Sequence, residues 1–285
     1  MRLVSYQAET GPRVAALRGG KYIDLNAADP SWPTSMKLLI AQGPSESEKI
    51  AQAIRNGSPL DVDQVRLLAP VPDPEKVICI GLNYADHAAE SGAKIPKQPV
   101  VFNKFPTAVA AHEDLIRLPR ISKKVDYEAE LVVVIGEGGR NIAREDAMSH
   151  VFGYTCGHDV SARDWQLETP GRQWLLGKTF DTFAPFGPHL VSADEIDDPH
   201  QLNISLRLNG EVMQDSNTRQ LIFPIDQLIA HVSGVCTLTP GDVIFTGTPP
   251  GVGMARKPPV FLKHGDVVEV DIEKIGILGN EVEAE

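Results

Sequence analysis

The sequence predicts an α+β protein that is mostly β, with a small N-terminal α+β domain at residues 1–70 and a larger catalytic domain at residues 71–285. Most apolar segments are short and alternate with period two, which is typical of strands. Few segments show the longer apolar periodicity of amphipathic helices. Pro70, Pro72 and Pro74 form an extended connector, which marks the expected boundary between the two domains.

The N-terminal domain is expected to contain a hairpin followed by two short helices. Residues 14–17 and 22–25 are strand-like, and two adjacent glycines lie in the turn between them. Residues 34–41 and 46–55 have the pattern of short helices. No residue pattern in this domain predicts catalysis.

The catalytic domain is expected to combine several strands with a few helices in mixed sheets. Asn209-Gly210 between two alternating segments is a strong hairpin signal. The predicted elements are a strand at 77–80, a helix at 83–91, strands at 203–208 and 211–213, a helix at 228–232, and strands at 243–246 and 268–273.

A segment of acids followed by apolar residues, 126–136, predicts one strand that enters the core. Side chains on a strand alternate between its faces, so Asp126, Glu128 and Glu130 are expected to share one face. Burying three carboxylates together is costly unless a cation or protons offset their charge. A divalent cation would do so. The alternative is a solvated strand end with surface acids, and spacing alone favours neither interpretation.

Composition and charge restrict the partners that the chain can bind. Its 285 residues, 42% of them hydrophobic, are enough for a sizeable core, and its net charge is −11. Without a run rich in Lys and Arg, binding to nucleic acid or to an anionic membrane surface is not expected. A small anionic substrate can still bind where a few cations gather in one cleft.

Three widely spaced cysteines, Cys79, Cys156 and Cys236, form neither a disulfide framework nor a CxxC metal pattern. Cys79 and Cys156 lie in apolar, strand-like sequence and are expected to be buried free thiols, which fits a reducing compartment. The N-terminal residues lack the apolar core of a signal peptide, and no apolar run approaches transmembrane length. The sequence therefore predicts a cytoplasmic protein.

The helix expected at residues 83–91 carries a candidate acid–base pair. His87 and Glu90 are three residues apart and hence neighbours on a helix. A carboxylate beside an imidazole fixes its tautomer, which suits proton transfer. The alternative, which the segment alone favours, is a surface ion pair. Gly92 and Pro96 would let this helix act as a mobile lid.

Two further segments place polar side chains beside apolar sequence. Asp159 ends an apolar strand, where it is a candidate third oxygen ligand, and Arg163 and Gln166 follow with one-turn spacing that could hold a substrate carboxylate. The alternative is a capped strand-to-helix turn. Lys178 lies within apolar sequence, so its ammonium is expected to face a cleft or to reach solvent along its stem.

The glycines in residues 245–253 would let backbone N–H groups approach an anion, but this segment lacks the Lys and the spacing of a nucleotide-binding P-loop. Other catalytic templates are also missing from the sequence. It contains no GxSxG or HExxH motif and no dinucleotide GxGxxG after a strand.

Taken together, these segments resemble the fumarylacetoacetate hydrolase superfamily, from about residue 77 to residue 282. The order and number of the motifs carry the resemblance. Residues 159–188 are similar to the oxaloacetate tautomerase-like branch of mitochondrial fumarylacetoacetate hydrolase domain-containing proteins and their bacterial relatives. The resemblance implies a mixed β-roll or β-sandwich catalytic domain, a homodimer, and a small 2-oxo acid as substrate.

The resemblance also implies a role for individual residues. It assigns the ligands of one Mg²⁺ or Mn²⁺ ion, with Ca²⁺ as an alternative, to Glu128, Glu130 and Asp159. It assigns the lid pair to His87 and Glu90, the active-site lysine to Lys178, the substrate contacts to Arg163, Gln166 and Thr248, and a pocket lysine to Lys104. Carboxylate ligands select a hard cation over zinc, in agreement with this assignment.

The implied chemistry passes through an enolate of the 2-oxo acid, and three reactions share it. Enol–keto tautomerisation or decarboxylation of oxaloacetate, or of a close β-keto diacid, is the preferred hypothesis. The alternatives are C–C hydrolysis of an acylpyruvate or 2,4-diketo acid and isomerisation of a 2-hydroxymuconate-type diene. A rival of another class is a non-catalytic, metal-stabilised binding protein. All the implied site residues are present in this sequence, which argues against this rival.

Overall fold

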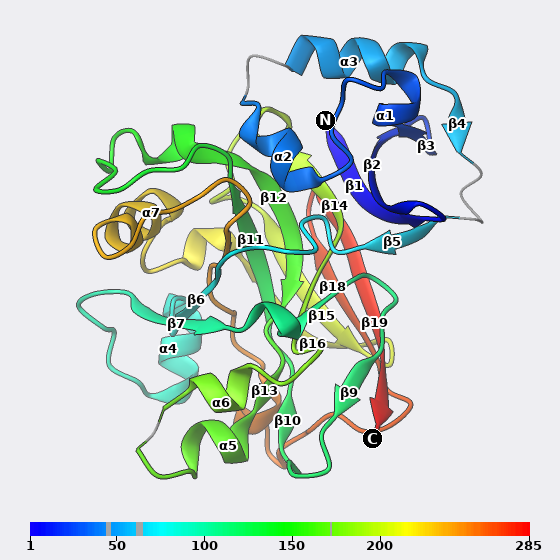
Figure 1. Ribbon diagram of the computed structural model, residues 1–285. Helices are drawn as coiled ribbons and strands as arrows, with labels where there is room; N and C mark the ends of the chain where they lie inside the picture. Colours follow the sequence, from blue (N-terminus) through cyan, green and yellow to red (C-terminus); the bar gives the residue numbers. More distant parts are fainter. Residues whose placement is uncertain (44–46, 61–64, 172) are drawn as a thin grey trace.

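One large mixed sheet runs through the computed structural model, which describes residues 1–43, 47–60, 65–171 and 173–285 (Figure 1). Its strands lie in the order β4-β3-β2-β1-β14-β12-β11-β17-β6-β7, and β5 and β8 pair with β1 and β14. The strands are β1 Arg2–Ala8, β2 Gly11–Arg18, β3 Lys21–Asp24, β4 Pro59–Leu60, β5 Arg66–Leu68, β6 Val77–Gly81, β7 Val100–Lys104, β8 Val109–Ala110, β11 Ala129–Ile135, β12 Val151–His158, β14 Ala184–Ser192 and β17 Val243–Phe245.

A second sheet, in the order β16-β15-β18-β19-β9, packs against the middle of the first, and a short pair joins β10 to β13. Their strands are β9 Ile116–Leu118, β10 Val125–Asp126, β13 Ser161–Ala162, β15 Asn203–Leu208, β16 Glu211–Asn217, β18 Val267–Ile272 and β19 Gly276–Ala284.

Helices α1 to α6 gather at two ends of the sheets, and α7 lies apart from both groups (Figure 1). Helices α1 to α3 lie beside β1 to β3, whereas α4, α5 and α6 lie together at the opposite end, below β6 and β7. The helices are α1 Leu25–Ala28, α2 Met36–Ala41, α3 Ser47–Asn56, α4 Ala85–Ser91, α5 Arg163–Leu167, α6 Leu175–Lys178 and α7 Ile225–Ser233, with short 3₁₀ helices η3 Pro106–Ala108, η4 Ala147–His150, η5 Ala193–Glu195, η6 Thr218–Gln220 and η7 Gly253–Ala255.

Strand β11 lies between two hydrophobic cores, which explains its continuous apolar run. All of its residues are buried. Leu131 and Val133 face the core between the two sheets, whereas Val132 and Val134 face the core on the other side, shared with the N-terminal helices. A strand covered on both faces needs apolar side chains at every position. This central strand therefore provides a rigid base for the acids that precede it.

The predicted α+β class, mostly β, is confirmed, and both predicted hairpins are present. Asn209 and Gly210 have φ angles of 53° and 82°, the left-handed values that a tight hairpin turn between β15 and β16 requires. The helix predicted at 83–91 is α4, and Gly92 ends it with a left-handed φ of 63°.

The prediction of one continuous strand over 126–136 is wrong. The segment divides into β10 and β11, with Tyr127 and Glu128 between them. The partner strand breaks at the same level: β12 ends at His158, and the chain pairs again with β10 only at β13. Tyr127 N instead donates to the side chain of Asp126 (2.8 Å). As a result, Asp126 does not belong to the group of carboxylates that Glu128 and Glu130 form with Asp159.

Strand β14 was not predicted, and two prolines lie within it. Pro185 and Pro188 cannot donate to a ladder, so they argue against a central strand. In the structure, β14 pairs with β1 on one side and with β12 on the other, and its register with β12 is irregular between Tyr154 and Cys156. The irregularity spans Pro188, whereas Pro185 lies opposite Ala110 of β8.

The strands before residue 70 continue the large sheet, since β1 pairs with β14. Ser5 Oγ donates to Pro70 O at 2.7 Å, and Leu3 and Val14 belong to the same core as Val132. The division into domains at residue 70 stays a prediction.

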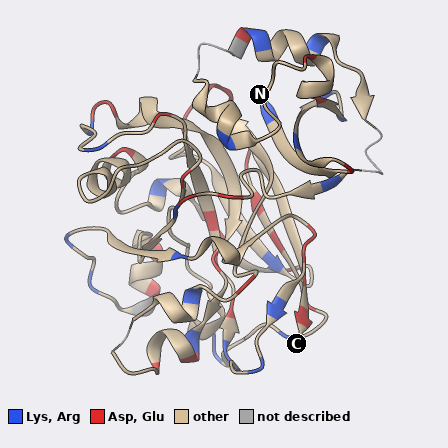
Figure 2. Ribbon diagram, in the orientation of Figure 1, with Lys and Arg blue, Asp and Glu red and all other residues tan. Residues whose placement is uncertain are grey.

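Charged residues of both signs are interspersed over the described chain (Figure 2). None of its helices is long and apolar enough to cross a membrane.

Candidate functional site

Three buried carboxylates come together where β11 and β12 meet α4, α5 and α6. Oxygen atoms of Glu128, Glu130 and Asp159 all lie within 4.8 Å of one another. Because β11 and β12 are antiparallel neighbours, the start of one lies beside the end of the other. Asp159 N also donates to Glu128 O at 2.9 Å. The backbone therefore fixes the separation of the three acids, which could hold a divalent metal ion.

Lys178 bridges two of these acids. Its Nζ lies 2.8 Å from Glu128 Oε2 and 2.9 Å from Asp159 Oδ2. Burial alone would raise the pKa of Glu128, but the charges of Lys178 and Arg163 outweigh it and lower this pKa to about 2. Burial would lower the pKa of Lys178, yet Asp159 and Glu128 raise it. The ion pair between Lys178 and Glu128 therefore favours the charged form of both groups.

Glu130 differs from the other two acids because it forms no ion pair with a described Lys or Arg. Its Oε2 accepts a hydrogen bond from Gly247 N at 2.7 Å. Burial, together with the charges of Asp159 and Glu128, raises its pKa well above the usual value. A buried carboxylate that lacks a cation, beside two further carboxylate oxygens, suits a hard divalent ion. The donor set therefore fits Mg²⁺ or Mn²⁺.

Gly247 can reach Glu130 only because it has no side chain. Its φ is 108°, and a Cβ there would lie 2.7 Å from the Cβ of Asn83. Asn83 itself is fully buried, and its Nδ2 donates to Thr246 O (2.7 Å) and to Phe223 O (3.1 Å). This amide thus ties the segment that leads into α4 to the segment that donates to the acidic cluster.

Arg163 points its guanidinium into the acids from the first turn of α5. It donates to Asp126 (2.8 Å), Glu128 (2.6 Å) and Gln166 (2.9 Å). Helix α6 can approach α5 closely because Gly177 packs on the Gln166 backbone, where a Cβ would lie 2.5 Å from Gln166 N. Arg163 therefore already has protein acceptors at three nitrogens, and its role as a contact for a substrate carboxylate stays a prediction.

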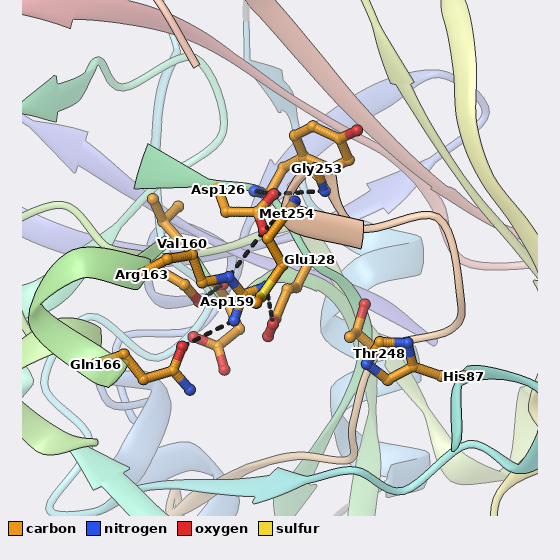
Figure 3. Close-up of polar contacts among 12 residues, drawn as sticks. His87, Asp126, Glu128, Asp159, Val160, Arg163, Gln166, Thr248, Gly253 and Met254 are labelled. Atoms are coloured by element: carbon orange, nitrogen blue, oxygen red, sulfur yellow. Dashed lines mark hydrogen bonds and ion pairs between the residues drawn. The ribbon is translucent and has the colours of Figure 1, made fainter. Parts of the chain in front are cut away.

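Asp126 lies behind the cluster rather than within it. It accepts hydrogen bonds from Gly253 N (2.7 Å) and Met254 N (3.0 Å) in addition to that from Arg163. These bonds anchor the segment at η7 to β10 (Figure 3). Sequence alternation placed Asp126 on the face of Glu128, and the break after β10 gives it this anchoring position instead.

Lys104 also lies behind the cluster. Its Nζ is 2.6 Å from Asp159 Oδ1 and donates to Val160 O (2.9 Å) and Phe183 O (2.6 Å). Burial lowers its pKa, although Asp159 acts in the opposite direction. Lys104 does not line the cavity that contains the other candidate residues. It holds Asp159 in place from the far side.

Helix α4 is docked over the acidic cluster. His87 Nδ1 lies 3.2 Å from Glu90 Oε2, as expected from their spacing. Glu90 also accepts from Gly251 N (3.0 Å), and Asp86 accepts from Ser216 Oγ at 2.5 Å. These contacts join the helix to two other segments. His87 thereby lies beside Thr248 at the edge of the site (Figure 3).

One cavity of about 520 Å³ contains nine of the ten candidate residues. They are His87, Glu90, Glu128, Glu130, Asp159, Arg163, Gln166, Thr248 and Lys178. Sequence analysis missed the aromatic residues that line this cavity and a glutamine that supports one of its side chains. Phe102 and Trp174 form part of the wall, and Gln214 donates to Thr248 Oγ1 at 2.9 Å. Gln214 lies in an unremarkable strand pattern, so its role has no sequence signal.

Comparisons with known proteins identify relatives of this chain. Residues 76–283 match the sequence profile described as "Fumarylacetoacetate (FAA) hydrolase C-terminal". A mitochondrial oxaloacetate tautomerase from Xenopus laevis is 52% identical over 99% of this chain and 90% of its own.

Two solved structures are similar over the whole chain. A fumarylacetoacetate hydrolase from Exiguobacterium antarcticum has a TM-score of 0.86 and 36% identity, covering 100% of both chains. A maleylpyruvate hydrolase from Sphingobium sp. SYK-6, in complex with manganese(II) and pyruvate, has a TM-score of 0.84 and 34% identity, covering 100% of this chain and 99% of its own.

Proposed function

Because the chain belongs to the fumarylacetoacetate hydrolase family of enzymes, we propose that it interconverts the enol and keto forms of oxaloacetate or of a close β-keto diacid. The observation that carries this proposal is the position of Lys178, whose ammonium lies between two acids of the cluster and faces the same cavity as His87. The relative from Xenopus laevis, named an oxaloacetate tautomerase, supports the choice of substrate.

The acidic cluster fits a divalent metal ion, and we propose Mg²⁺ or Mn²⁺, held by Glu128, Glu130 and Asp159. When bound, such an ion would polarise the 2-oxo group of the substrate and offset the negative charge of the buried acids. The proposal draws support from the manganese in the related maleylpyruvate hydrolase. It also draws support from Glu130, a buried carboxyl that forms no ion pair with a described Lys or Arg and whose pKa is raised well above its usual value.

The side chains of this chain would divide the remaining work. Lys178 has three N–H groups, two of which point to Glu128 and Asp159. The third would donate to the C2 oxygen of the substrate, where it would stabilise negative charge. His87, oriented by Glu90, would transfer the proton at C3. Gln166 and Thr248 offer uncharged hydrogen-bonding groups to the carboxylate oxygens.

The proposed activity can be tested by following enol absorbance and pyruvate release together. Metal-stripped protein is supplied with oxaloacetate, with and without Mg²⁺ or Mn²⁺, and the rate without protein is subtracted. Metal-dependent loss of enol without pyruvate is expected. Matched release of pyruvate would mean a decarboxylase, which is the other form of this proposal. No effect on either signal would contradict both.

The His87→Gln variant is expected to lose about 10²- to 10⁴-fold in tautomerisation rate, because it removes the group that transfers the proton. Metal binding, measured by the metal-induced rise in thermal midpoint, is expected to persist. His264→Gln is a matched control, since His264 is exposed near the C-terminus. Full activity of the His87 variant would exclude an acid–base role for this residue.

A second candidate function is C–C hydrolysis of an acylpyruvate or 2,4-diketo acid. The structural similarity to a maleylpyruvate hydrolase bound to pyruvate favours it. The 34% identity to a 5-carboxymethyl-2-hydroxymuconate Δ-isomerase supports diene isomerisation in the same way. Release of pyruvate from an acylpyruvate, with no action on oxaloacetate, would establish the hydrolase instead.

We also propose a homodimer, with an apolar groove of about 590 Å³ along β7 and α7 in the interface. Val235 and Phe105 line it, with 74% and 46% of their surface exposed. Light scattering is expected to give twice the chain mass, and Val235→Glu is expected to lower it. Leu38→Glu, at an exposed leucine of α2, is the control. A wild-type protein with the mass of one chain would contradict this proposal.

The cytoplasmic location stays a prediction, and the relative from Xenopus laevis is mitochondrial.

A further inference from the structure

We propose that the cavity also accepts monocarboxylic 2-oxo acids with an aromatic group on C3, the arylpyruvates, and interconverts their enol and keto forms. This inference uses the proposed chemistry of Lys178 and His87 but extends it to a substrate class without a second carboxylate. Five features of the cavity away from the acidic cluster support it.

The part of the cavity that is lined by apolar side chains, here called its outer part, is large. Its walls include Leu82, Phe102, Leu167, Trp174, Val252 and Met254. Cavities of about 300–1,000 Å³ accommodate ligands of the size of a drug. A four-carbon acid bound beside the acidic cluster would therefore leave much of the 520 Å³ cavity unfilled. An aryl group on C3 would occupy the apolar part of the cavity.

Two large apolar side chains are exposed at this cavity. Leu167 is 43% exposed and Met254 is 39% exposed, and both belong to the lining. Covering apolar surface is favourable by about 25 cal/mol per Å². A ligand with an apolar group would gain this contribution, whereas the second carboxylate of a diacid would not.

An aromatic wall connects the outer part of the cavity to the reacting end. The rings of Trp174 and Phe102 lie 5.5 Å apart, edge to face at 72°. Trp174 also packs directly on Gly81, where a Cβ would lie 2.3 Å from its Cζ3. Lys178 Nζ lies 5.1 Å from the centroid of Phe102. A ring attached to C3 would therefore meet an aromatic surface while the C2 oxygen faces the ammonium.

Leu82 lies in this wall with a φ of 49°, in the left-handed region. A non-glycine residue there costs on the order of 1 kcal/mol, and such strain is concentrated at functional sites. The strained backbone places a large apolar residue where β6 leads into α4. We therefore interpret the position of Leu82 in the cavity wall as functional.

The outer part of the cavity offers no lysine or arginine among its described residues. Among the described residues that line the cavity, the lysine and the arginine are Lys178 and Arg163. Lys178 forms an ion pair with Asp159, and Arg163 forms one with Asp126. Apart from His87, no cationic side chain among the described residues is placed to meet a second carboxylate. A monocarboxylic acid avoids this unpaired charge.

The proposed reaction is balanced without another reactant. The enol O–H bond breaks, a C3–H bond forms, and the C2–C3 double bond is replaced by the C2–O double bond. The proton lost from oxygen is matched by the proton gained at carbon, so no oxidant or reductant is needed.

The test uses the full chain with Mg²⁺ and the enol of phenylpyruvate, whose absorbance falls on ketonisation. Catalysis with a kcat/KM within tenfold of that for oxaloacetate is expected. Trp174→Ala is expected to lower the ratio of kcat/KM for phenylpyruvate to that for oxaloacetate at least tenfold. Leu167→Glu, at an exposed position, is expected to do the same and serves if the tryptophan variant fails to fold.

Trp165→Ala is the matched control, because Trp165 packs on Phe180 and donates to Ile121 O, outside the cavity lining. Its kcat/KM ratio is expected to equal that of the wild type. Activity on oxaloacetate without any on phenylpyruvate would overturn this inference and leave the proposed function intact. Activity on phenylpyruvate without any on oxaloacetate would support the inference and contradict the proposal that oxaloacetate is a substrate. Equal ratios in the Trp174, Leu167 and Trp165 variants would overturn the assignment of the wall.

Discussion

Replacing Glu130 with Gln is expected to stabilise the metal-stripped protein and to abolish its activity. Glu130 is buried, has no ion-pair partner among the described residues, and its pKa is raised by burial and by the charges of Asp159 and Glu128. An amide removes that repulsion while an oxygen can still accept the Gly247 N–H. The thermal midpoint is therefore expected to rise by a few degrees, since about 1 kcal/mol shifts the midpoint of a chain of this size by roughly 2–4 °C.

The same change removes a proposed metal ligand. The rate of oxaloacetate tautomerisation with Mg²⁺ is expected to fall about a thousandfold, since a metal ion contributes several kcal/mol to such a step. The measurements are the thermal midpoint with and without Mg²⁺ and the rate of enol loss. In the variant, Mg²⁺ is expected to raise the midpoint little. Glu137→Gln, at an exposed position beyond the end of β11, is the control. A variant that keeps wild-type activity would contradict the assignment of Glu130 as a ligand.

Replacing Lys178 with Met is expected to change stability in the opposite direction. The ammonium bridges Glu128 and Asp159 at 2.8 and 2.9 Å, and its loss leaves these buried acids with less compensating charge. Breaking a buried pair in this way costs about 3–5 kcal/mol, so the midpoint of the metal-stripped protein is expected to fall by roughly 10 °C. Added Mg²⁺ is expected to raise the midpoint more than in the wild type.

Activity of the Lys178 variant is expected to fall about 10²- to 10³-fold even with saturating Mg²⁺, because the donor to the C2 oxygen is missing. The rate of enol loss and the metal-induced change in midpoint separate this effect from a loss of metal binding. Lys263→Met, at an exposed lysine, controls for the loss of one charge. Should the variant turn over oxaloacetate at the wild-type rate, Lys178 would have only a structural role.

The fold class and much of the site could be predicted because they depend on local patterns. Glu128 and Glu130 have period-two spacing, and Asp159 ends an apolar strand, so each could be noted from its own segment. Their meeting depends on the pairing of β11 with β12, which the family resemblance implied but local spacing does not show. The environment of Asp126 could not be foreseen, because the break after β10 arises from a matching break in its partner strand.

The supporting contacts were the least predictable part of the site. Lys104 reaches Asp159 from a strand that precedes it by about fifty residues, and Gln214 reaches Thr248 from β16. Neither position stands out in its own segment, because pairing between distant segments leaves no local spacing signal. Pro188 argues against a central strand for a related reason: its compatibility with the sheet depends on the irregular pairing of β14 with β12.

The pairing of β1 with β14 has a consequence for the order in which the chain can assemble during synthesis. Arg2 lies opposite Val191, so β1 leaves the ribosome long before its partner exists. At about 5–20 residues per second, that interval is roughly 10–40 s. During this time β1 can use only β2 and β5, which pair with it from nearby sequence. Contacts so distant in sequence slow folding, so the central sheet can close only late in translation.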